Sequence, residues 1–333
     1  MRVAHTGTDA MDYNENSMPF FSVIVPLYNK APHVNRSISS VLRQTFTQYE
    51  LIIINDASTD SSLDEVRKFS DPRIKLFQRN EPSPGGYAAR NLGIRESRAA
   101  WVAFLDADDE WHSRHLERVF EGIRQFPDVG MVSSGWWISG EGKEKKYNEY
   151  YIHNKAKGSH LYDIRTYIQG ARPIWTSVAV VQRELLAEIG GFDERWQHGA
   201  DKDVWLRVLL TLNMQALCIS ELGATYHMDS VNRVSAKLFQ VSSPSAASIK
   251  NYLETHPIIA EDLHLQLRQY ANKLSMKAFV RKILHDDISI RDIAGTFFFG
   301  ALPAKSRVYI IFLYLLPVFL RKKVVLRIVN RLV

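Results

Sequence analysis

The amino-acid sequence predicts an α/β fold in which a mostly parallel central sheet is flanked by helices, followed by a helical C-terminal extension. Between residues 20 and 139, continuous apolar runs alternate with amphipathic helical patterns, as expected of βαβ units. Beyond a Ser- and Ala-rich linker at 235–250, the pattern is helical to the end. A length of 333 residues, 46% of them hydrophobic, allows one large domain or two with a real core.

The expected elements follow one another regularly along the chain. The runs at 20–27 and 51–54 are almost wholly apolar, which is typical of strands buried on both faces of a sheet. The patterns from Pro32 and over 116–123 place their apolar residues on one face of a helix. We expect strands at residues 20–27, 51–54, 73–78, 101–105 and 129–138. We expect helices from Pro32, from Ser62, after Gly86, over 116–123 and, later in the chain, over 201–212.

Cysteine content and charge restrict the class of protein. The single cysteine, Cys218, excludes an internal disulfide framework and fits a reducing compartment. Residues 1–18 lack the apolar segment of a secretory signal, so we expect a cytoplasmic protein. The net charge is +6, but residues 303–333 carry seven basic side chains and no acid, so the remainder is nearly neutral. A nearly neutral body argues against a nucleic-acid groove and indicates an anionic membrane surface or an acidic partner for the tail.

The acidic stretch after the expected strand at 101–105 is the main candidate for a functional site. Asp106 and Asp108 are separated by one residue, so both side chains can turn toward one point at the carboxyl edge of the sheet. Neighbouring carboxylates repel one another unless a cation lies between them, and Mg²⁺ or Mn²⁺ prefers carboxylate oxygens together with phosphates. The stretch therefore predicts a divalent-metal site for a diphosphate substrate. The alternative is a solvated acidic turn that caps the next helix.

Two common nucleotide-binding motifs do not occur in the sequence. No Gly-x-Gly-x-x-Gly follows the first expected strand, and no Gly-Lys-Ser/Thr is found anywhere. Dinucleotide-binding and P-loop interpretations therefore lose their main support.

Several motifs, in the same order along the chain, resemble those of the family 2 glycosyltransferases. The resemblance covers about residues 20–235. Two positions depart from the family, which more often has Gly at Ala57 and usually has Glu at Ala200; the second change removes one acid but leaves Asp201. The motifs are 22–29 (SVIVPLYN), 56–60 (DASTD), 86–93 (GYAARNLG), 106–108 (DAD), 190–194 (GGFDE) and 199–207 (GADKDVWLR).

This resemblance implies a GT-A fold, a nucleotide-sugar donor, a divalent metal and inversion at the anomeric carbon. The metal would stabilise the charge that develops on the departing nucleoside diphosphate. Asp108 would be a metal ligand, Asp106 would share the metal or bind the ribose, and Asp201 would take the proton from the acceptor hydroxyl. Asp56 would accept the N3–H of a uracil. The nucleotide-binding residues implied are Pro26, Tyr28, Asn29, Asp56, Ser58, Arg90 and Asp106.

Each of these assignments has a structural alternative. Asp56 could cap a turn, Asp201 could be the N-cap of a helix from residue 202, and Arg90 could pair with a surface acid. His227 follows an expected strand and is a candidate third metal ligand, although an isolated histidine often has only a structural role. Three tryptophans could form sugar platforms or pack in the core, which is the commoner use of this residue: Trp136, Trp137 and Trp175.

The sequence divides into three regions. Residues 1–19 are expected to form a flexible arm, and 20–235 a catalytic domain with a nucleotide-sugar half (20–139) and an acceptor half (140–235). Residues 236–333 are a helical region ending in a basic, apolar tail at 296–333. The apolar run at 308–320 is too short to cross a bilayer, which needs about 20 residues. We expect the tail to lie on an anionic membrane surface; the alternative is packing on the catalytic domain or in a dimer contact.

The sequence as a whole indicates an inverting, Mn²⁺- or Mg²⁺-dependent glycosyltransferase that uses a nucleotide-sugar donor, expected to be UDP-linked. The acceptor would be a glycan or a lipid-linked saccharide, and the enzyme would lie peripherally on the cytoplasmic face of the inner membrane. The sequence does not determine the oligomeric state. Two other hypotheses remain: a non-catalytic nucleotide-sugar or glycan-binding module, favoured only by Ala200, and a sugar nucleotidyltransferase, which would release pyrophosphate.

Overall fold

The computed structural model describes residues 18–140, 143–147, 158–169, 173–211, 215–231, 243–285, 297–304, 306–307 and 310. The chain forms two compact units. The first comprises Met1–Tyr162, Arg172–Gly191 and Met214–Asn232, and the second comprises Asp163–Ala171, Phe192–Asn213 and Arg233–Val333. Most of the expected N-terminal arm lies outside the described residues.

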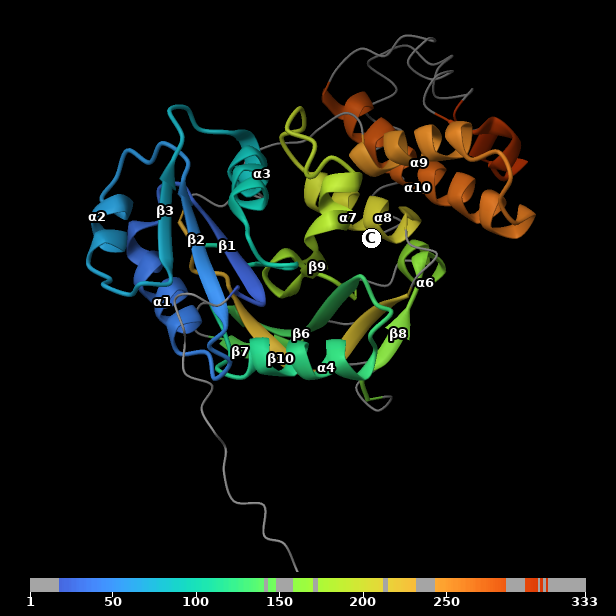
Figure 1. Ribbon diagram of the computed structural model, residues 1–333. Helices are drawn as coiled ribbons and strands as arrows, with labels where there is room; N and C mark the ends of the chain where they lie inside the picture. Colours follow the sequence, from blue (N-terminus) through green and yellow to red (C-terminus); the bar gives the residue numbers. More distant parts are fainter. Residues whose placement is uncertain are drawn as a thin grey trace, which may run out of the picture. The chain divides into compact units, whose positions relative to one another are not determined.

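The described part of the first unit contains one mixed sheet, whose order is β3-β2-β1-β4-β9-β6-β10-β5, with β7 beside β6 and β8 beside β10 (Figure 1). The bounds of these strands are β1 Phe21–Leu27, β2 Tyr49–Asn55, β3 Ile74–Gln78, β4 Trp101–Phe104, β5 Glu110–Trp111, β6 Met131–Gly140, β7 Lys143–Tyr147, β8 His160–Tyr162, β9 Val180–Gln182 and β10 Ala216–His227.

The sheet is parallel in its N-terminal part and mixed beyond it. β1 pairs in parallel with β2 and β4, and β2 with β3. The short strand β9 then lies between β4 and β6 and runs antiparallel to both. The expectation of a mostly parallel sheet therefore holds for the first four strands, while β5, β7 and β8 add further antiparallel pairs.

Helices cover both faces of the parallel strands, because successive side chains of a strand point to opposite faces. Leu51 and Ile53 of β2 belong to the core cluster that contains Val34 of helix α1, whereas Ile52 packs in a second cluster with Ala89 of helix α3. Both faces of β2 are thus apolar, as its continuous apolar sequence predicted. The helices of this unit are α1 Ala31–Leu42, α2 Ser62–Arg67, α3 Tyr87–Glu96, α4 His115–Gln125 and α7 Arg183–Glu188, with the 3₁₀ turns η1 Pro84–Gly86 and η3 Thr176–Val178.

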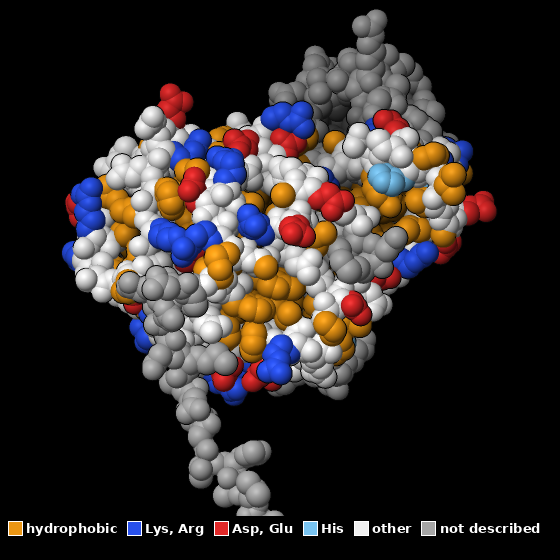
Figure 2. Space-filling view, viewed as in Figure 1, with side chains coloured by type: hydrophobic (Ala, Val, Ile, Leu, Met, Phe, Trp, Pro, Cys, Tyr) orange, Lys and Arg blue, Asp and Glu red, His pale blue; other side chains and the backbone are white. Residues whose placement is uncertain are grey.

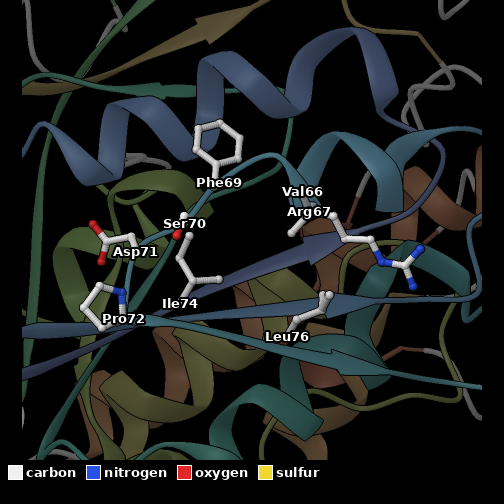
Figure 3. A pocket seen from close by; sticks show the side chains of 8 residues that line it. All are labelled: Val66, Arg67, Phe69, Ser70, Asp71, Pro72, Ile74 and Leu76. Carbon is white, nitrogen blue, oxygen red and sulfur yellow. The ribbon is translucent and has the colours of Figure 1, made fainter.

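A surface pocket of about 440 Å³ lies between α2 and the amino end of β3 (Figure 3). Its walls come from one stretch of chain, Val66 to Leu76, and include Phe69, Pro72 and Ile74. Ligand sites of α/β sheets lie at the opposite, carboxyl ends of the strands. This pocket is therefore not part of the candidate site described below.

The second unit is helical in its described part. Trp205 of α8 is 2% exposed and packs against Phe192 with ring centroids 5.7 Å apart. Helix α9 begins at Pro244, so the second half of the linker expected at 235–250 is helical. The helices are α6 Ile164–Ile168, α8 Ala200–Thr211, α9 Pro244–Thr255 and α10 Glu261–His285, followed by the 3₁₀ turn η5 Phe299–Ala301.

The beginning of the basic, apolar tail packs on α10. The Asn272 side chain accepts a hydrogen bond from the Phe298 amide at 2.8 Å and donates one to the Phe298 carbonyl at 2.9 Å. Ile310 is fully buried. Within the described ranges, no helix has both the length and the hydropathy needed to cross a bilayer. Residues 311–333 of the tail lie outside the described residues.

Candidate active site

The candidate site lies at the carboxyl edge of the parallel strands in the first unit. Leu27, the last residue of β1, pairs with Asn55, the last residue of β2, so the loops that follow these strands begin at the same level. Asp56 follows β2 directly, and Asp106 lies two residues beyond the end of β4. The parallel register thus brings together polar residues that are about 50 positions apart in the sequence, as the argument from strand ends predicted.

Three carboxylates crowd the turn after β4. Asp106, Asp108 and Asp109 each have an oxygen within 4.8 Å of the others. Asp109 is 1% exposed, and burial raises its pKa well above the ordinary value, with a further increase from the charges of Asp108 and Asp106. Such crowding favours either protonation or a bound cation. An all-oxygen set fits hard cations such as Mg²⁺ and Mn²⁺.

Two basic side chains from other parts of the first unit form ion pairs with the carboxylates of this turn. Arg90, which is 6% exposed, pairs with Asp106 Oδ1 and also donates to the Gly85 carbonyl at 2.8 Å. Lys30 Nζ lies 2.7 Å from Asp108 Oδ2. Burial acts to raise the pKa of Asp108, but the charge and hydrogen bonds of Lys30, with help from Ser230, hold this pKa below its usual value. Asp108 is therefore kept ionised, as a metal ligand must be.

Ser177 of η3 holds the acidic turn in place from the other side. Its hydroxyl donates to Asp109 Oδ2 at 2.7 Å and accepts from the backbone amide of Asp106 at 3.2 Å. The carbonyl of the same residue accepts a hydrogen bond from Trp111 Nε1 at 2.6 Å. One serine from a distant stretch of sequence thus fixes the backbone and one carboxylate of the turn.

Asp56 lies 1% exposed at the end of β2 and is surrounded by donors. One carboxylate oxygen pairs with Arg79, and the other accepts from the amide and hydroxyl of Ser83 at 3.0 and 2.8 Å. Asp56 therefore does bind the turn at 79–83, as the structural alternative proposed. Arg79 and Ser83 are part of the candidate site that the sequence did not indicate, because no motif contains them.

The loops after β1 and β2 are joined by Asn29. Its side-chain Oδ1 accepts a hydrogen bond from the backbone amide of Thr59 at 2.8 Å, and its backbone amide donates one to Ser58 Oγ at 3.1 Å. Asn29 has a φ of +51° and Ala57 a φ of +57°, the left-handed region that side chains with a Cβ rarely adopt. Tyr28 is 40% exposed at this edge.

Two other predicted residues also border this edge. Pro26 lies beside the left-handed Gly86, where an added Cβ would be 3.5 Å from Pro26 Cβ. His227 lies at the end of β10, and its Nε2 is 3.2 Å from Glu110 Oε2. Its backbone amide donates to Asp109 Oδ1 at 3.3 Å. Among the described residues, the group of side chains close enough to hold one metal ion consists of Asp106, Asp108 and Asp109 and does not include the His227 imidazole.

Asp201 belongs to the second unit. Helix α8 begins at Ala200, so Asp201 lies within the first turn rather than capping a helix from residue 202. It is half-buried, and Asp203 in the same turn is buried and pairs with Arg207 at 2.7 Å. A carboxylate in the first turn of a helix is favoured by the helix dipole.

Two of the tryptophans that are candidate sugar platforms lie side by side in the first unit. Trp136 and Trp175 have ring centroids 5.6 Å apart, and both pack against the core cluster of the first unit. Tyr226 lies edge-on to Trp175 at 5.2 Å. On the face shown in Figure 2, Lys and Arg side chains lie among Asp and Glu side chains rather than in a continuous basic band.

Comparison with known proteins identifies the family. Residues 22–190 match the family model for Glycosyl transferase family 2. The chain is 32% identical over 217 residues to the amylovoran biosynthesis glycosyltransferase AmsB of Erwinia amylovora, covering 62% of this chain and 69% of AmsB. It is 43% identical over 96 residues to WfgD of Escherichia coli, a UDP-Glc:α-D-GlcNAc-diphosphoundecaprenol β-1,3-glucosyltransferase. That match covers 29% of this chain and only 38% of WfgD.

A solved structure confirms the architecture. TarS 1–349 of S. aureus, in complex with UDP-GlcNAc, superposes with a TM-score of 0.65 at 18% identity, covering 85% of this chain and 79% of the TarS chain. The fold is therefore the α/β GT-A type expected from the sequence, with a mixed sheet flanked by helices and further helices at the C-terminus. From the family match and the ordered motifs, this chain belongs to glycosyl transferase family 2.

Proposed function

We propose that the chain transfers a sugar from a UDP-sugar to a hydroxyl group of a glycan or lipid-linked acceptor, with inversion at the anomeric carbon. The observation that carries the proposal is the carboxyl edge of the first unit, where Asp56 follows β2 and both Asp106 and Asp108 follow β4. Arg90 of helix α3 pairs with Asp106 at this edge. The family membership, the UDP-sugar named for WfgD and the UDP-GlcNAc complex of TarS support the donor class. The diphospholipid substrate named for WfgD supports a lipid-linked acceptor.

The nucleotide would bind to the loops after β1 and β2. Asp56 is the acceptor for the uracil N3–H, and its pairing with Arg79 and Ser83 supports the role by holding the carboxylate in one orientation. The exposed ring of Tyr28 offers a surface to the base. The remaining nucleotide-binding residues in the proposal are Pro26, Asn29, Ser58, Arg90 and Asp106.

Asp106 and Asp108 would hold a divalent cation, Mn²⁺ or Mg²⁺. The crowding of three carboxylates and the ionised state of Asp108 fit such a cation. When bound, the metal stabilises negative charge on the departing diphosphate. His227 would be the third ligand of this cation, which requires its imidazole to leave Glu110.

Asp201 is proposed as the general base that takes the proton of the acceptor hydroxyl. Its half-buried position in the first turn of α8 supports this role, since a carboxylate there is accessible and is favoured by the helix dipole. The neighbouring acid, Asp203, is already paired with Arg207. We also propose peripheral attachment to the cytoplasmic face of the inner membrane through the basic tail.

The test is incubation of the full chain with a panel of nucleotide sugars and Mn²⁺, first by thermal shift and then by product analysis. A ligand that binds only the folded state raises the melting temperature, which identifies the donor. Release of free UDP supports glycosyl transfer, and release of pyrophosphate would instead indicate a nucleotidyltransferase. Donor binding without any product, in the presence of candidate acceptors, would favour a non-catalytic binding module.

Asp108→Ala should abolish both sugar transfer and the Mn²⁺-dependent part of donor binding, because it removes a ligand oxygen from the proposed metal site. Asp64→Ala is the matched control, since Asp64 lies on α2 with 71% of its side chain exposed and pairs with Arg67 on the same helix. Full activity of Asp108→Ala, or of the wild type in excess chelator, would rule out the metal assignment.

A further inference from the structure

The ammonium group of Lys30 is completely engaged at the acidic turn. Its Nζ donates to Asp108 Oδ2 at 2.7 Å, to Ser230 Oγ at 2.7 Å and to the carbonyl of Val231 at 2.6 Å. An ammonium has three protons, so these three acceptors satisfy it. The side chains of Lys30 and Asp108 are only 14% and 15% exposed, and solvent therefore screens this ion pair weakly.

The same ion pair holds the segment 229–231, which follows β10. Ser230 Oγ donates to the Asp108 oxygen that Lys30 also contacts, so one carboxylate oxygen accepts two hydrogen bonds. Lys30 and Asp108 together thereby fix Ser230 and Val231. Two further contacts join the segment to α1: Arg36 Nη1 to Asp229 Oδ2 at 3.2 Å, and the Val231 amide to His33 Nε2 at 3.2 Å.

A divalent cation bound to either oxygen of Asp108 would lie within a few ångströms of the Lys30 ammonium on Oδ2, where solvent screens the repulsion between the two cations only weakly. A metal ion and an ammonium group cannot both lie within bonding distance of one oxygen without strong repulsion, and the metal's own ligands would fill the space around it. We propose that Lys30 is an internal cation that competes with the divalent metal for Asp108, and that metal binding frees Lys30 and releases the segment 229–231. The proposal rests on the metal site of the proposed function.

A purely structural role for Lys30 makes the opposite prediction. If Lys30 only held the segment and the acidic turn in shape, its removal would loosen Asp108 and weaken metal binding. If Lys30 competes with the metal, its removal leaves Asp108 with an uncompensated charge and strengthens metal binding. The direction of the change in metal affinity therefore distinguishes the two roles.

The experiment is a Mn²⁺ titration of the full chain without nucleotide, in which free Mn²⁺ is measured by electron paramagnetic resonance. Lys30→Met should bind Mn²⁺ about 10-fold more tightly or better, which is the lower end of the effect of one adjacent opposite charge on a carboxylate. Lys68→Met is the matched control, because Lys68 pairs with Glu65 on the exposed face of α2 and should leave the affinity unchanged. Equal or weaker binding by Lys30→Met would overturn the proposal.

Asp108→Asn separates this failure from failure of the metal site itself. If the wild type and Asp108→Asn bind Mn²⁺ equally, the metal site of the proposed function is wrong. If Asp108→Asn loses Mn²⁺ while Lys30→Met gains nothing, only the competition is wrong. Melting temperatures of the variants verify that each is folded.

Hydrogen exchange of the wild type tests the release without any substitution. The Val231 amide, which donates to His33 Nε2, should exchange faster at saturating Mn²⁺. The Gly191 amide, bonded to the Leu186 carbonyl at 2.8 Å, should exchange at the same rate with and without the metal. An unchanged or slower exchange at Val231 would contradict the release of the segment.

Discussion

Ala57 has a left-handed backbone, with φ of +57°, in the turn that carries Asp56 and Ser58. This conformation costs a residue with a Cβ about 1–2 kcal/mol, whereas glycine loses about 0.5–1 kcal/mol more entropy on folding. Ala57→Gly should therefore raise the free energy of unfolding by roughly 0.5–1 kcal/mol, measured by chemical denaturation. As a control, Ala88→Gly in α3 should lower the free energy of unfolding. A lower free energy of unfolding in Ala57→Gly would show that the backbone of the turn is not strained.

Asp201→Asn preserves the size and hydrogen bonding of the proposed base but cannot accept a proton. Donor and metal affinity should survive, while kcat falls by roughly 10²–10⁴-fold, the usual contribution of general-base catalysis. The measurement is kcat beside the donor Kd. Asp193→Asn is a control in the same unit, because Asp193 is bound by Arg195 and Trp196. If kcat of Asp201→Asn holds within a few-fold, or donor binding is lost with it, another group must act as the base.

Sequence motifs reveal the side chains that a ligand would contact. They do not reveal the residues that hold those side chains in position. Asp56, Asp106 and Asp108 follow buried strands and belong to short motifs, so their grouping at one edge was predictable. Arg79 and Ser177 come from stretches without a motif, and only the folded chain brings them to these carboxylates. Their contacts depend on tertiary packing, which a local pattern does not contain.

Helix α3 lies against β1 through Gly93. A Cβ on Gly93 would be 2.6 Å from Cγ2 of Ile24, whose side chain is fully buried and has no room to move. Helix propensity alone favours alanine over glycine by about 1 kcal/mol, whereas overpacking a core costs about 1–3 kcal/mol. Because the contact is so short, Gly93→Ala should destabilise the protein by roughly 1–2 kcal/mol net.

The measurement for Gly93→Ala is again the free energy of unfolding, with Ile24→Val added in the same chain as the matched control. Ile24→Val removes Cδ1, which would lie 3.0 Å from the new Cβ, and leaves room in which the remaining side chain can move away from it. The double variant should recover part of the loss, so the two effects should be non-additive. Additive effects, or a stabilised Gly93→Ala, would show that α3 moves away from β1 without cost.

Strands with continuous apolar sequences were predicted well, whereas their pairing partners were not. The expected strands at 20–27 and 51–54 correspond to β1 and β2, because burial on both faces makes the middle of each run almost wholly apolar. The three-residue strand β9 is too short for any period to be visible, yet its position between β4 and β6 makes the sheet mixed. Pairing order is set by long-range contacts, which local propensity does not determine.

Across the whole molecule, some buried ionisable side chains have hydrogen-bond partners that stabilise their charged form, and others have none. Glu50, which is 1% exposed, accepts hydrogen bonds from Ser22, Lys75 and Arg98; burial acts to raise its pKa, but these donors lower it overall. His115 lacks such compensation: it is 1% exposed on α4, and no described residue bonds its Nε2. A buried imidazole without an acceptor is stable only when neutral.

His115 should therefore make the stability of the protein depend on pH. Burial, with smaller contributions from His112 and Arg118, lowers the pKa of His115 from 6.5 to about 3. Because the folded pKa lies below the unfolded one, the stabilisation is fully present above pH 6.5 and is lost progressively as the pH falls toward 3. At pH 5 the loss from this residue is about 2 kcal/mol, since a difference of one pKa unit corresponds to about 1.4 kcal/mol.

The measurement is the free energy of unfolding at pH 7.5 and pH 5 for the wild type and His115→Gln. The variant will have a lower stability at pH 7.5, because glutamine fits the site against Trp111 less well than the imidazole, whose ring centroid is 4.7 Å from that of Trp111. Its decline between the two pH values should nevertheless be smaller by about 2 kcal/mol, because it has no group that titrates there. His256→Gln, on the exposed surface of the second unit, should keep the wild-type decline. An equal decline in His115→Gln would mean that the acid sensitivity comes from other groups.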